Sequence, residues 1–429
     1  MRYLFIIMSL SVACSAFCQQ SVLMLKYRQM ALDYNHDIKS ARENISASLE
    51  LVGAAKADLK PKLQGGASYQ YTGNPMELNI DIPAAGSPVH FQGQHNSYGL
   101  SAALSQPVYS GGRLLAMLRK AEFQHDYARN QELLLKNGVS QQSDVTYWSS
   151  VAHGEMVSVA EDSKKAVEKL VKLVRQRVEL GYTDVNDLLM AEVKLNEAEY
   201  TLQQSKTLLA TSVMSLNSLI GAPLCNETEL DKEVTAITSS DRIYQLAQNV
   251  RPEQVMAQNQ LAISESDKKI NRAKYLPQLH VGAEGYYQSP SYDFTSQMKL
   301  NYGVYVKLSV PIFEWNKRGK EARAAQNRVN IANENLKKVD DKINLEVSTA
   351  RVSFIQAVEQ VNLTHNSLAK AFENERRSME RYAEGKLSVM DVLQVQLYRQ
   401  SAQINYIQAK LAAQCWWGSL QYALNLYNN

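Results

Sequence analysis

Four short runs of the chain alternate between apolar and polar residues. The apolar positions are Leu63, Gly65, Ala67, Tyr69 and Tyr71 in the first run; Tyr98, Leu100, Ala102 and Leu104 in the second; Leu279, Val281, Ala283 and Tyr287 in the third; and Tyr302, Val304, Val306, Leu308 and Val310 in the fourth. A period of two predicts β-strands, and each run has the ~9–11 residues that a tilted strand needs to cross a bilayer. A soluble antiparallel sheet with one solvated face shows the same alternation, so the pattern alone leaves both kinds of sheet open.

Aromatic residues lie near the ends of these runs, where the interfacial girdles of membrane barrels belong: Tyr69, Tyr71, Tyr109, Tyr287, Phe313 and Trp315. Single-chain outer-membrane barrels begin at about eight strands, and an open sheet edge in lipid leaves backbone groups unpaired. Strands of this chain in a membrane would therefore share one barrel with other copies. Three chains give about twelve strands and a lumen, whereas two give about eight and a filled interior. The alternative is a monomer whose sheet folds against its own helices.

Two long stretches of the chain contain no proline, from Pro107 to Pro223 and from Ile312 to the C-terminus. They predict long helices from Gly112 to Leu180 and from Lys317 to Glu384. Apolar spacings of four and three in the second stretch indicate a narrow coiled-coil seam: Ala325, Val329, Ala332, Leu336, Val339, Ile343, Val347, Ala350, Phe354, Ala357 and Val361. Shorter helices are predicted over residues 22–58, 191–220, 240–275 and 389–424.

The chain is an internal duplication. Tyr98-Gly99-Leu100 returns as Tyr302-Gly303-Val304, and the segment 181–189 returns as 385–393, both after about 204 residues. The extra residues of the first repeat fall in Gly73 to Ser97, whose prolines and glycines predict a loop. We divide the chain into a first repeat at 19–221, a connecting segment at 222–239 and a second repeat at 240–429. Each repeat reads helix, strand, loop, strand, long helix, turn, shorter helix.

The N-terminus predicts an export signal. Arg2 precedes an apolar run that is too short to span a bilayer, and small residues at Ala16 and Cys18 suit cleavage before Gln19. The signal peptide is thus expected at 1–18, with lipidation at Cys14 as the alternative. Cys225 and Cys415 remain in the mature chain, and the sequence leaves open whether they pair.

Charge and motifs exclude several classes of function. The net charge of +3 gives no electrostatic case for nucleic-acid binding. The seven histidines show no metal-ligand spacing, and no nucleophile elbow, P-loop or dinucleotide-binding motif is present. We therefore expect no enzyme, no cofactor and no metal site. The 13 methionines form no cluster that would indicate copper binding.

The repeated strand–strand–long-helix plan, the strand ends Tyr98-Gly99…Leu104-Ser105-Gln106-Pro107 and Tyr302-Gly303…Leu308-Ser309-Val310-Pro311, and the twin turns resemble the TolC family of outer-membrane efflux proteins. This resemblance implies an α+β membrane protein with a long α-helical coiled-coil barrel in the periplasm and a transmembrane β-barrel shared between subunits, four strands per chain. It also implies a passive homotrimeric exit duct in the outer membrane. Its partners would be a periplasmic adaptor protein and an inner-membrane pump that supplies the energy.

In the family, helix pairs close the periplasmic end. The resemblance places Asp391 in the aspartate ring of this gate, with Gln394 at the position of a second ring aspartate. It also matches Tyr382 and Asp187 to a closing contact, whose neighbouring arginine is replaced by Leu387. Independently of the family, Asp187 and Asp391 are at the start of predicted helices, where a negative charge interacts favourably with the dipoles of the backbone amides. Ser388 and Asp391 also have the spacing of a capping box.

The exposed turns Gly181-Tyr182 and Gly385-Lys386-Leu387 are where the resemblance implies contact with the adaptor. The other hypothesis is an exported coiled-coil adaptor or scaffold protein whose strands form a soluble sheet. The two differ in whether the apolar face of the strands meets lipid.

Overall fold

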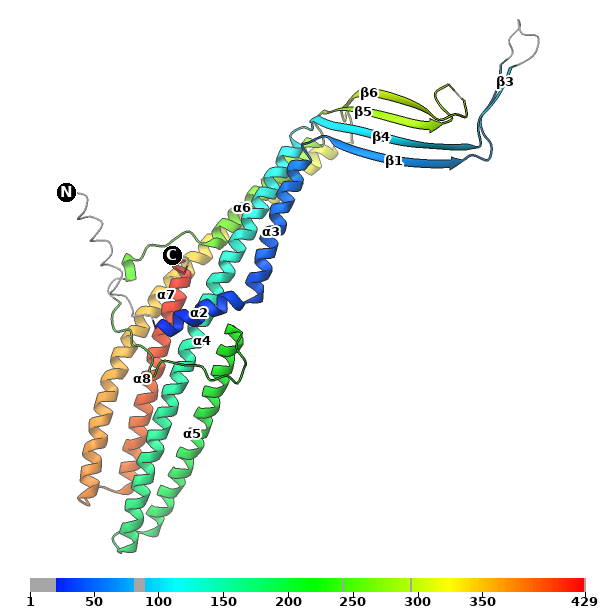
Figure 1. Ribbon diagram of the computed structural model, residues 1–429. Coiled ribbons are helices and arrows are strands. Elements are labelled where there is room, and N and C mark those ends of the chain that lie inside the picture. The colour runs from blue at the N-terminus through cyan, green and yellow to red at the C-terminus, as the bar shows by residue number, and fades with distance from the viewer. Residues whose placement is uncertain (1–20, 81–88, 241–242, 294, 428–429) are drawn as a thin grey trace, which may run out of the picture. The chain divides into compact units, whose positions relative to one another are not determined.

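The computed structural model describes residues 21–80, 89–240, 243–293 and 295–427. The expected signal peptide at 1–18, and the alternative lipidation site at Cys14, lie outside these residues. The chain forms two compact units. One comprises the residues up to Arg42, Asn130–Gln254 and the residues from Lys338, and the other comprises Glu43–Arg129 and Val255–Lys337. Figure 1 labels most of their helices and strands.

Two long helices are present where they were predicted. Helix α4 covers Arg113–Glu179 and helix α7 covers Lys317–Ala383, each with 67 residues. Helix α5, Val185–Ile220, follows α4, and helix α8, Val389–Ala423, follows α7. The seam predicted on α7 is the face that is covered, since eight of its positions are buried: Ala325, Ala332, Ile343, Val347, Ala350, Phe354, Ala357 and Val361. The absence of proline and the four–three spacing are thus sufficient to place these helices.

The helices that precede the strands differ from the prediction. The expected helix over 22–58 is divided into α2, Val22–Tyr34, and α3, His36–Ala57. Asn35 separates them, and its side-chain Oδ1 accepts a hydrogen bond of 3.0 Å from the backbone N–H of Ile38, as a helix N-cap does. The expected helix over 240–275 begins only with α6, Pro252–Ala273, after a short 3-10 turn η1 at Ile243–Gln245. Pro252 suits the first position of a helix because the N–H it lacks would have no partner there.

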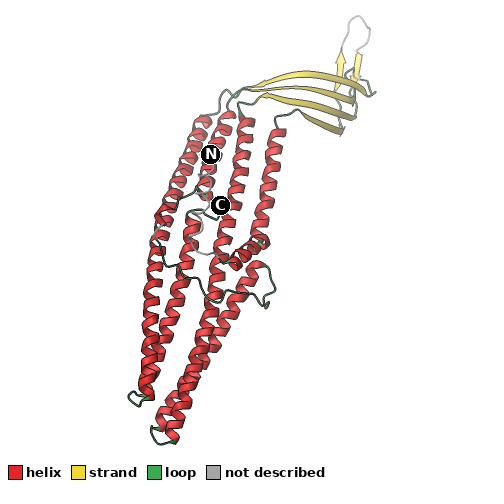
Figure 2. Ribbon diagram, turned by 60° about the vertical axis from the view of Figure 1, so that its left-hand side comes forward, coloured by secondary structure: helices red, strands yellow, loops and turns green. Residues whose placement is uncertain are grey.

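The strands form one antiparallel sheet in the order β1-β4-β5-β6. Its members are β1 at Lys62–Tyr71, β4 at Asn96–Tyr109, β5 at Gln278–Ser289 and β6 at Lys299–Ser309, drawn in yellow in Figure 2. The prediction of a plain loop over 73–97 is wrong. This segment contains a hairpin of β2, Glu77–Ile80, and β3, Val89–Gln92. The backbone N–H of Gly93 donates to the carbonyl of Met76 over 2.8 Å and closes the base of this hairpin. Its strands have only four residues each and lie among prolines, so the sequence pattern did not predict them.

The register of the sheet brings the apolar positions of all four runs to one face. Leu63 lies opposite Leu104, Leu100 lies opposite Tyr287, and Ala283 lies opposite Val304. Directly opposed residues share a face because the side-chain period of a strand is two. This apolar face is uncovered: Leu63 is 74% exposed and Val304 is 81% exposed. On the opposite face, Ser101 and Ala103 of the inner strand β4 are half-buried, whereas Gln64 and Lys307 of the edge strands β1 and β6 are exposed. Exposure of the apolar face is the reverse of what a sheet in a water-soluble protein shows.

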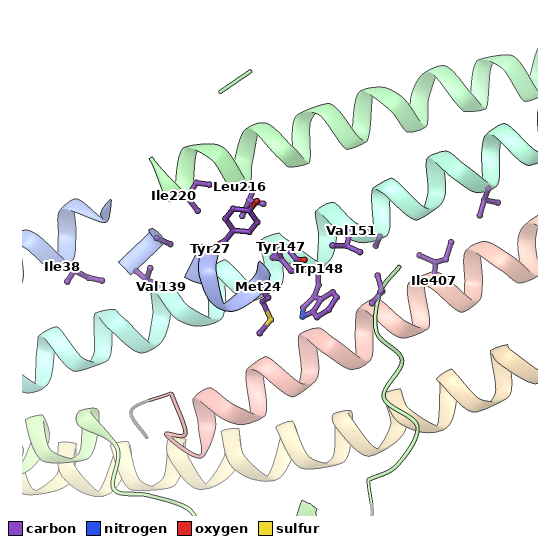
Figure 3. Close-up of a cluster of buried hydrophobic side chains, with 14 residues drawn as sticks. Met24, Tyr27, Ile38, Val139, Tyr147, Trp148, Val151, Leu216, Ile220 and Ile407 are labelled. Carbon is purple, nitrogen blue, oxygen red and sulfur yellow. The ribbon is translucent and has the colours of Figure 1, made fainter. Parts of the chain in front are cut away.

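The unit that contains the chain ends has its largest core where α2, α4, α5 and α8 meet. Figure 3 shows this cluster, in which Tyr27, Tyr147 and Trp148 lie among aliphatic side chains of the four helices. None of the helices in the described part of the chain combines the length and apolar character that crossing a membrane requires. Cys225 and Cys415 are free thiols, so the disulfide that the sequence left open is not formed.

Candidate functional site

The tips of two helix hairpins, α4–α5 and α7–α8, carry most of the site residues that the sequence singled out. Each turn is a Schellman motif with a left-handed glycine, Gly181 at φ +76° and Gly385 at φ +77°. The backbone N–H of Tyr182 donates to the carbonyl of Arg177 over 2.8 Å, and that of Lys386 donates to the carbonyl of Arg381 over 2.9 Å. The duplication seen in the sequence is therefore a duplication of backbone geometry, and Tyr182 and Lys386 are exposed on it.

Asp391 forms a reciprocal capping box with Ser388 at the start of α8. The Ser388 hydroxyl accepts a hydrogen bond from the Asp391 N–H over 3.2 Å, and the Asp391 carboxylate accepts from the Ser388 N–H over 3.2 Å and from its hydroxyl over 2.7 Å. The hydrogen bond from the Ser388 hydroxyl is the main cause of a lowered pKa of the Asp391 carboxyl. Asp391 is exposed, as is Gln394 in the next turn of the helix. The residues Asp391 and Gln394 thus present an ionised carboxylate and an amide to solvent.

Asp187 and Tyr382 line one open pocket between the two hairpin tips, together with Arg177, Thr183, Leu387 and Ser388. Asp187 is half-buried, and its carboxylate accepts a hydrogen bond from the Thr183 hydroxyl. The N-cap of its helix is Asp184, whose side chain accepts from the Asn186 N–H over 2.8 Å. The structure thus brings Asp187 and Tyr382 to the same pocket, whereas Asp391 and Gln394 are not among its lining residues.

Tyr382 is 2% exposed and packs with Leu170, Val174 and Val392. Its hydroxyl has no hydrogen-bond partner within the described residues, so its ring, and not its hydroxyl, makes the contacts of the chain. Burial is the main cause of the raised pKa of Tyr382; the positive charge of Arg177 opposes the rise, and the carboxylate of Asp187 adds to it. Asp187 therefore acts on Tyr382 through its charge and without a direct hydrogen bond.

Arg177 is the site residue that sequence reasoning missed. Its Nη2 donates to the carbonyls of Tyr382 and Ala383 over 3.0 and 3.2 Å, and its guanidinium carbon lies 4.4 Å from the centroid of the Tyr382 ring. A cation at the last carbonyls of a helix is favourable, and here it stabilises the end of α7. An arginine was expected beside Tyr382 at position 387, where the chain has leucine. The chain supplies it from the first repeat, four residues before Gly181.

The sheet carries the second functional surface. Beyond its exposed apolar face, aromatic side chains are exposed toward both ends of the strands. Phe313 and Trp315 follow β6 and contact each other edge to face, with ring centroids 5.1 Å apart, while Tyr69, Tyr71 and Tyr287 lie near the opposite ends of their strands. An apolar band between two aromatic girdles is the pattern of a strand surface that meets lipid. Within the described residues, no group of acidic, histidine or cysteine side chains could hold a metal ion.

A family model described as outer membrane efflux protein matches residues 27–222 and 243–426 of the chain. Three solved channel structures are similar to it, each at 16% sequence identity. The CmeC outer membrane channel of Campylobacter jejuni has a TM-score of 0.78 over 94% of this chain and 85% of that one. The outer membrane protein VceC of Vibrio cholerae has 0.79 over 94% and 95%. The open state of the MtrE outer membrane channel of Neisseria gonorrhoeae has 0.75 over 94% and 88%. A search of curated proteins finds no match.

Proposed function

Because the chain belongs to the outer membrane efflux protein family, whose members are channels and not enzymes, we propose that three copies of it form the exit duct of an efflux or type I secretion system. The chain is a protein of the outer membrane, with its helical part in the periplasm. In the proposed assembly the duct is passive. A periplasmic adaptor docks on its helical end, and an inner-membrane pump supplies the energy.

The exposed apolar face of the sheet carries this proposal. In the described residues, β1 and β6 are the two edges of a four-stranded sheet and each pairs on one side only. Unpaired edges in lipid cost several kcal/mol per backbone group, so a stable membrane form needs β6 of one copy to pair with β1 of the next. Three copies supply about twelve strands, which leave an interior wide enough for a lumen. The apolar face then meets lipid.

The opposite face of the sheet suits the wall of that lumen. It carries Gln64, Ser101, Glu284 and Lys307, and the Tyr286 hydroxyl donates to the Glu284 carboxylate over 2.7 Å. Polar and charged side chains on this face would be wetted inside a barrel, as the interior of porin-type barrels is. The two repeats, 19–221 and 240–429, each contribute two strands and one helix hairpin to this plan, and the segment 222–239 joins them.

The hairpin tips are the proposed gate. Asp391 and Gln394 are exposed at the start of α8, where three copies would form a ring of carboxylates that favours cations. Arg177 and Tyr382 hold the α4–α5 tip against the α7–α8 tip of the same chain, and Asp187 lines the pocket between the tips. The turns with Gly181, Tyr182, Gly385, Lys386 and Leu387 are the proposed contacts of the adaptor, because they are the outermost residues of the two hairpins.

A pair of neighbouring alanines tests the proposal. Ala102 lies on the apolar face of β4 and Ala103 lies on the polar face beside Glu284. In a membrane duct Ala102→Arg should impair assembly, since a charge at mid-bilayer costs about 2–4 kcal/mol, whereas Ala103→Arg should be tolerated. The readouts are recovery in the outer-membrane fraction, migration as a trimer in mild detergent and conductance in planar bilayers. A soluble, monomeric mature protein, indifferent to both changes, would support the exported scaffold instead.

A further inference from the structure

The duplication places a second arginine, Arg381, in the position that Arg177 has in the first repeat. Each lies four residues before the left-handed glycine of its turn, and the carbonyl of each accepts the same Schellman hydrogen bond. Their surroundings differ. Arg177 is half-buried against the end of α7, whereas Arg381 is exposed and its side chain has no hydrogen-bond or ion-pair partner in the described residues. The guanidinium group of Arg177 thus has hydrogen-bond acceptors within the chain, whereas that of the equivalent Arg381 has none in the described residues.

We propose that Arg381 binds the C-terminal end of helix α4 in the next copy of this chain. The proposal rests on the trimeric duct proposed above. The contact within one chain is head to tail, because Arg177 at the end of α4 donates to the last carbonyls of α7, whereas Arg381 at the end of α7 makes no reciprocal hydrogen bond within the described residues. Head-to-tail contacts between similar units close into a ring when the same contact repeats. In a ring of six hairpins, the second hairpin of each chain then makes the equivalent contact with the first hairpin of its neighbour.

The acceptors expected for Arg381 follow from the offset of about 204 residues between the two repeats. Arg177 donates to the carbonyls of Tyr382 and Ala383, so Arg381 donates to the carbonyls of Val178 and Glu179 of the neighbouring copy. These are the last carbonyls of α4, where the negative end of the helix dipole favours a cation. The glutamate adds a second attraction. Glu179 is exposed and its carboxylate has no ion-pair partner in the described part of the chain, so an unpaired cation and an unpaired anion meet at this contact.

The contact between copies differs from the contact within a chain in one respect. Tyr382 supplies the aromatic face on which Arg177 lies, with the guanidinium carbon 4.4 Å from the ring centroid. The equivalent position in the first repeat is Val178, which has no ring. The interface between copies therefore depends on charge and on helix-end carbonyls, and its strength falls with ionic strength more than that of the contact within the chain.

Cross-linking of cysteine variants tests the inference. In a chain whose Cys225 and Cys415 are replaced by serine and alanine, we compare two double-cysteine variants after treatment with a short thiol-reactive cross-linker. The first variant carries Glu179→Cys and Arg381→Cys, and the second carries Arg177→Cys and Ala383→Cys. The first pair should give dimer and trimer bands on a denaturing gel. The second pair, which joins residues of one chain, should stay at the monomer position. Each single variant is the control for contacts between identical residues.

Co-expression of two differently tagged chains, one with Glu179→Cys alone and one with Arg381→Cys alone, completes the test. The expected product is a cross-linked band that carries both tags. A preparation that migrates as a trimer in mild detergent but gives no such band would overturn the inference and leave the proposed duct intact. A preparation with no trimer would overturn both. Cross-linking of the Glu179/Arg381 pair within single chains would also overturn it, because the contact would then lie inside one copy.

Discussion

The guanidinium group of Arg177 lies over the ring of Tyr382, although the two residues are 205 positions apart and belong to different repeats. Arg177 also donates to two carbonyls at the end of α7, so one side chain joins the two hairpin tips by a cation–π contact and two charge-assisted hydrogen bonds. The contact is half-buried and is therefore only partly screened by solvent.

We expect Arg177→Ala to loosen the two hairpin tips. The loss of the cation–π contact and of the charged hydrogen bonds should weaken closure by about 1–2 kcal/mol, which is a factor of about 5–30 in an opening equilibrium. Single-channel recording in planar bilayers should show a corresponding rise in open probability. The matched control is Arg175→Ala, on the same helix as Arg177, which removes an exposed ion pair with Glu192 of α5 and should change little. Equal effects of both changes would contradict the role of Arg177.

The charge of Asp391 can be separated from its capping role. Asp391→Asn keeps a side-chain acceptor for the Ser388 N–H but removes the negative charge, whereas Ser388→Ala removes its hydroxyl from the cap and keeps the charge. If three Asp391 carboxylates line the proposed constriction, Asp391→Asn should reduce block of the pore by polyvalent cations, and Ser388→Ala should leave the block unchanged. The measurement is the concentration of the cation that halves the conductance. A similar shift in both variants would make the cap, and not the charge, responsible.

The sequence was sufficient for the parts of the fold that a repeating pattern specifies. Helix α7 begins at Lys317 as predicted. The apolar runs of the strands lie on one face of the sheet. In both kinds of element the period, 3.5 residues or two, decides which side chains share a face. Breaks set by one residue were not predicted. Asn35 divides a helix by capping the one that follows, and nothing in the periodicity marks it.

The proposed gate shows the same division: its local features were predicted from the sequence, and its tertiary contacts were not. The twin turns with Gly181 and Gly385 were recognisable, because a tight turn after a helix favours glycine at the left-handed position. Arg177 was not, since its partners are carbonyls of another helix and its own neighbourhood looks like an ordinary helix end. The available signal was its equivalence with Arg381 in the second repeat. A comparison of the two repeats position by position, rather than motif by motif, would have found it.

Replacing either turn glycine by alanine should lower the stability of the chain, whereas the same change at a glycine inside a helix should raise it. Gly181→Ala and Gly385→Ala would each force a side chain into a left-handed conformation, at a cost of about 1–2 kcal/mol. Gly138 lies within α4, and an added Cβ there meets nothing within 4 Å. Gly138→Ala should therefore stabilise the chain by about 0.5–1 kcal/mol. Thermal unfolding of the detergent-solubilised protein measures both, and a stabilising Gly385→Ala would contradict the geometry of the turn.

Tyr382 offers a test of whether the ring or the hydroxyl of this proposed gate residue contributes to stability. Its hydroxyl is buried without a hydrogen-bond partner in the described residues, so Tyr382→Phe should not lower the melting temperature at pH 7. Tyr382→Ala leaves a cavity among Leu170, Val174 and Val392 and should cost about 3–5 kcal/mol. A clear loss of stability in Tyr382→Phe would show that the hydroxyl is bonded in the assembled protein, to Asp187 or to a neighbouring copy.

The pH dependence of these variants follows from the raised pKa of Tyr382, which burial causes. The folded chain holds the phenol proton more tightly than the unfolded chain, whose tyrosines titrate near pH 10. The resulting stability is fully present below pH 10 and is lost as the pH rises from there toward the raised pKa. Tyr382→Phe removes this component, so unfolding midpoints measured between about pH 9 and 11 should fall less steeply in the variant than in the parent. Tyr398→Phe, at an exposed position on α8, is the control and should follow the parent. Parallel curves for the parent and Tyr382→Phe would show that this phenol titrates in the folded chain as it does in the unfolded one.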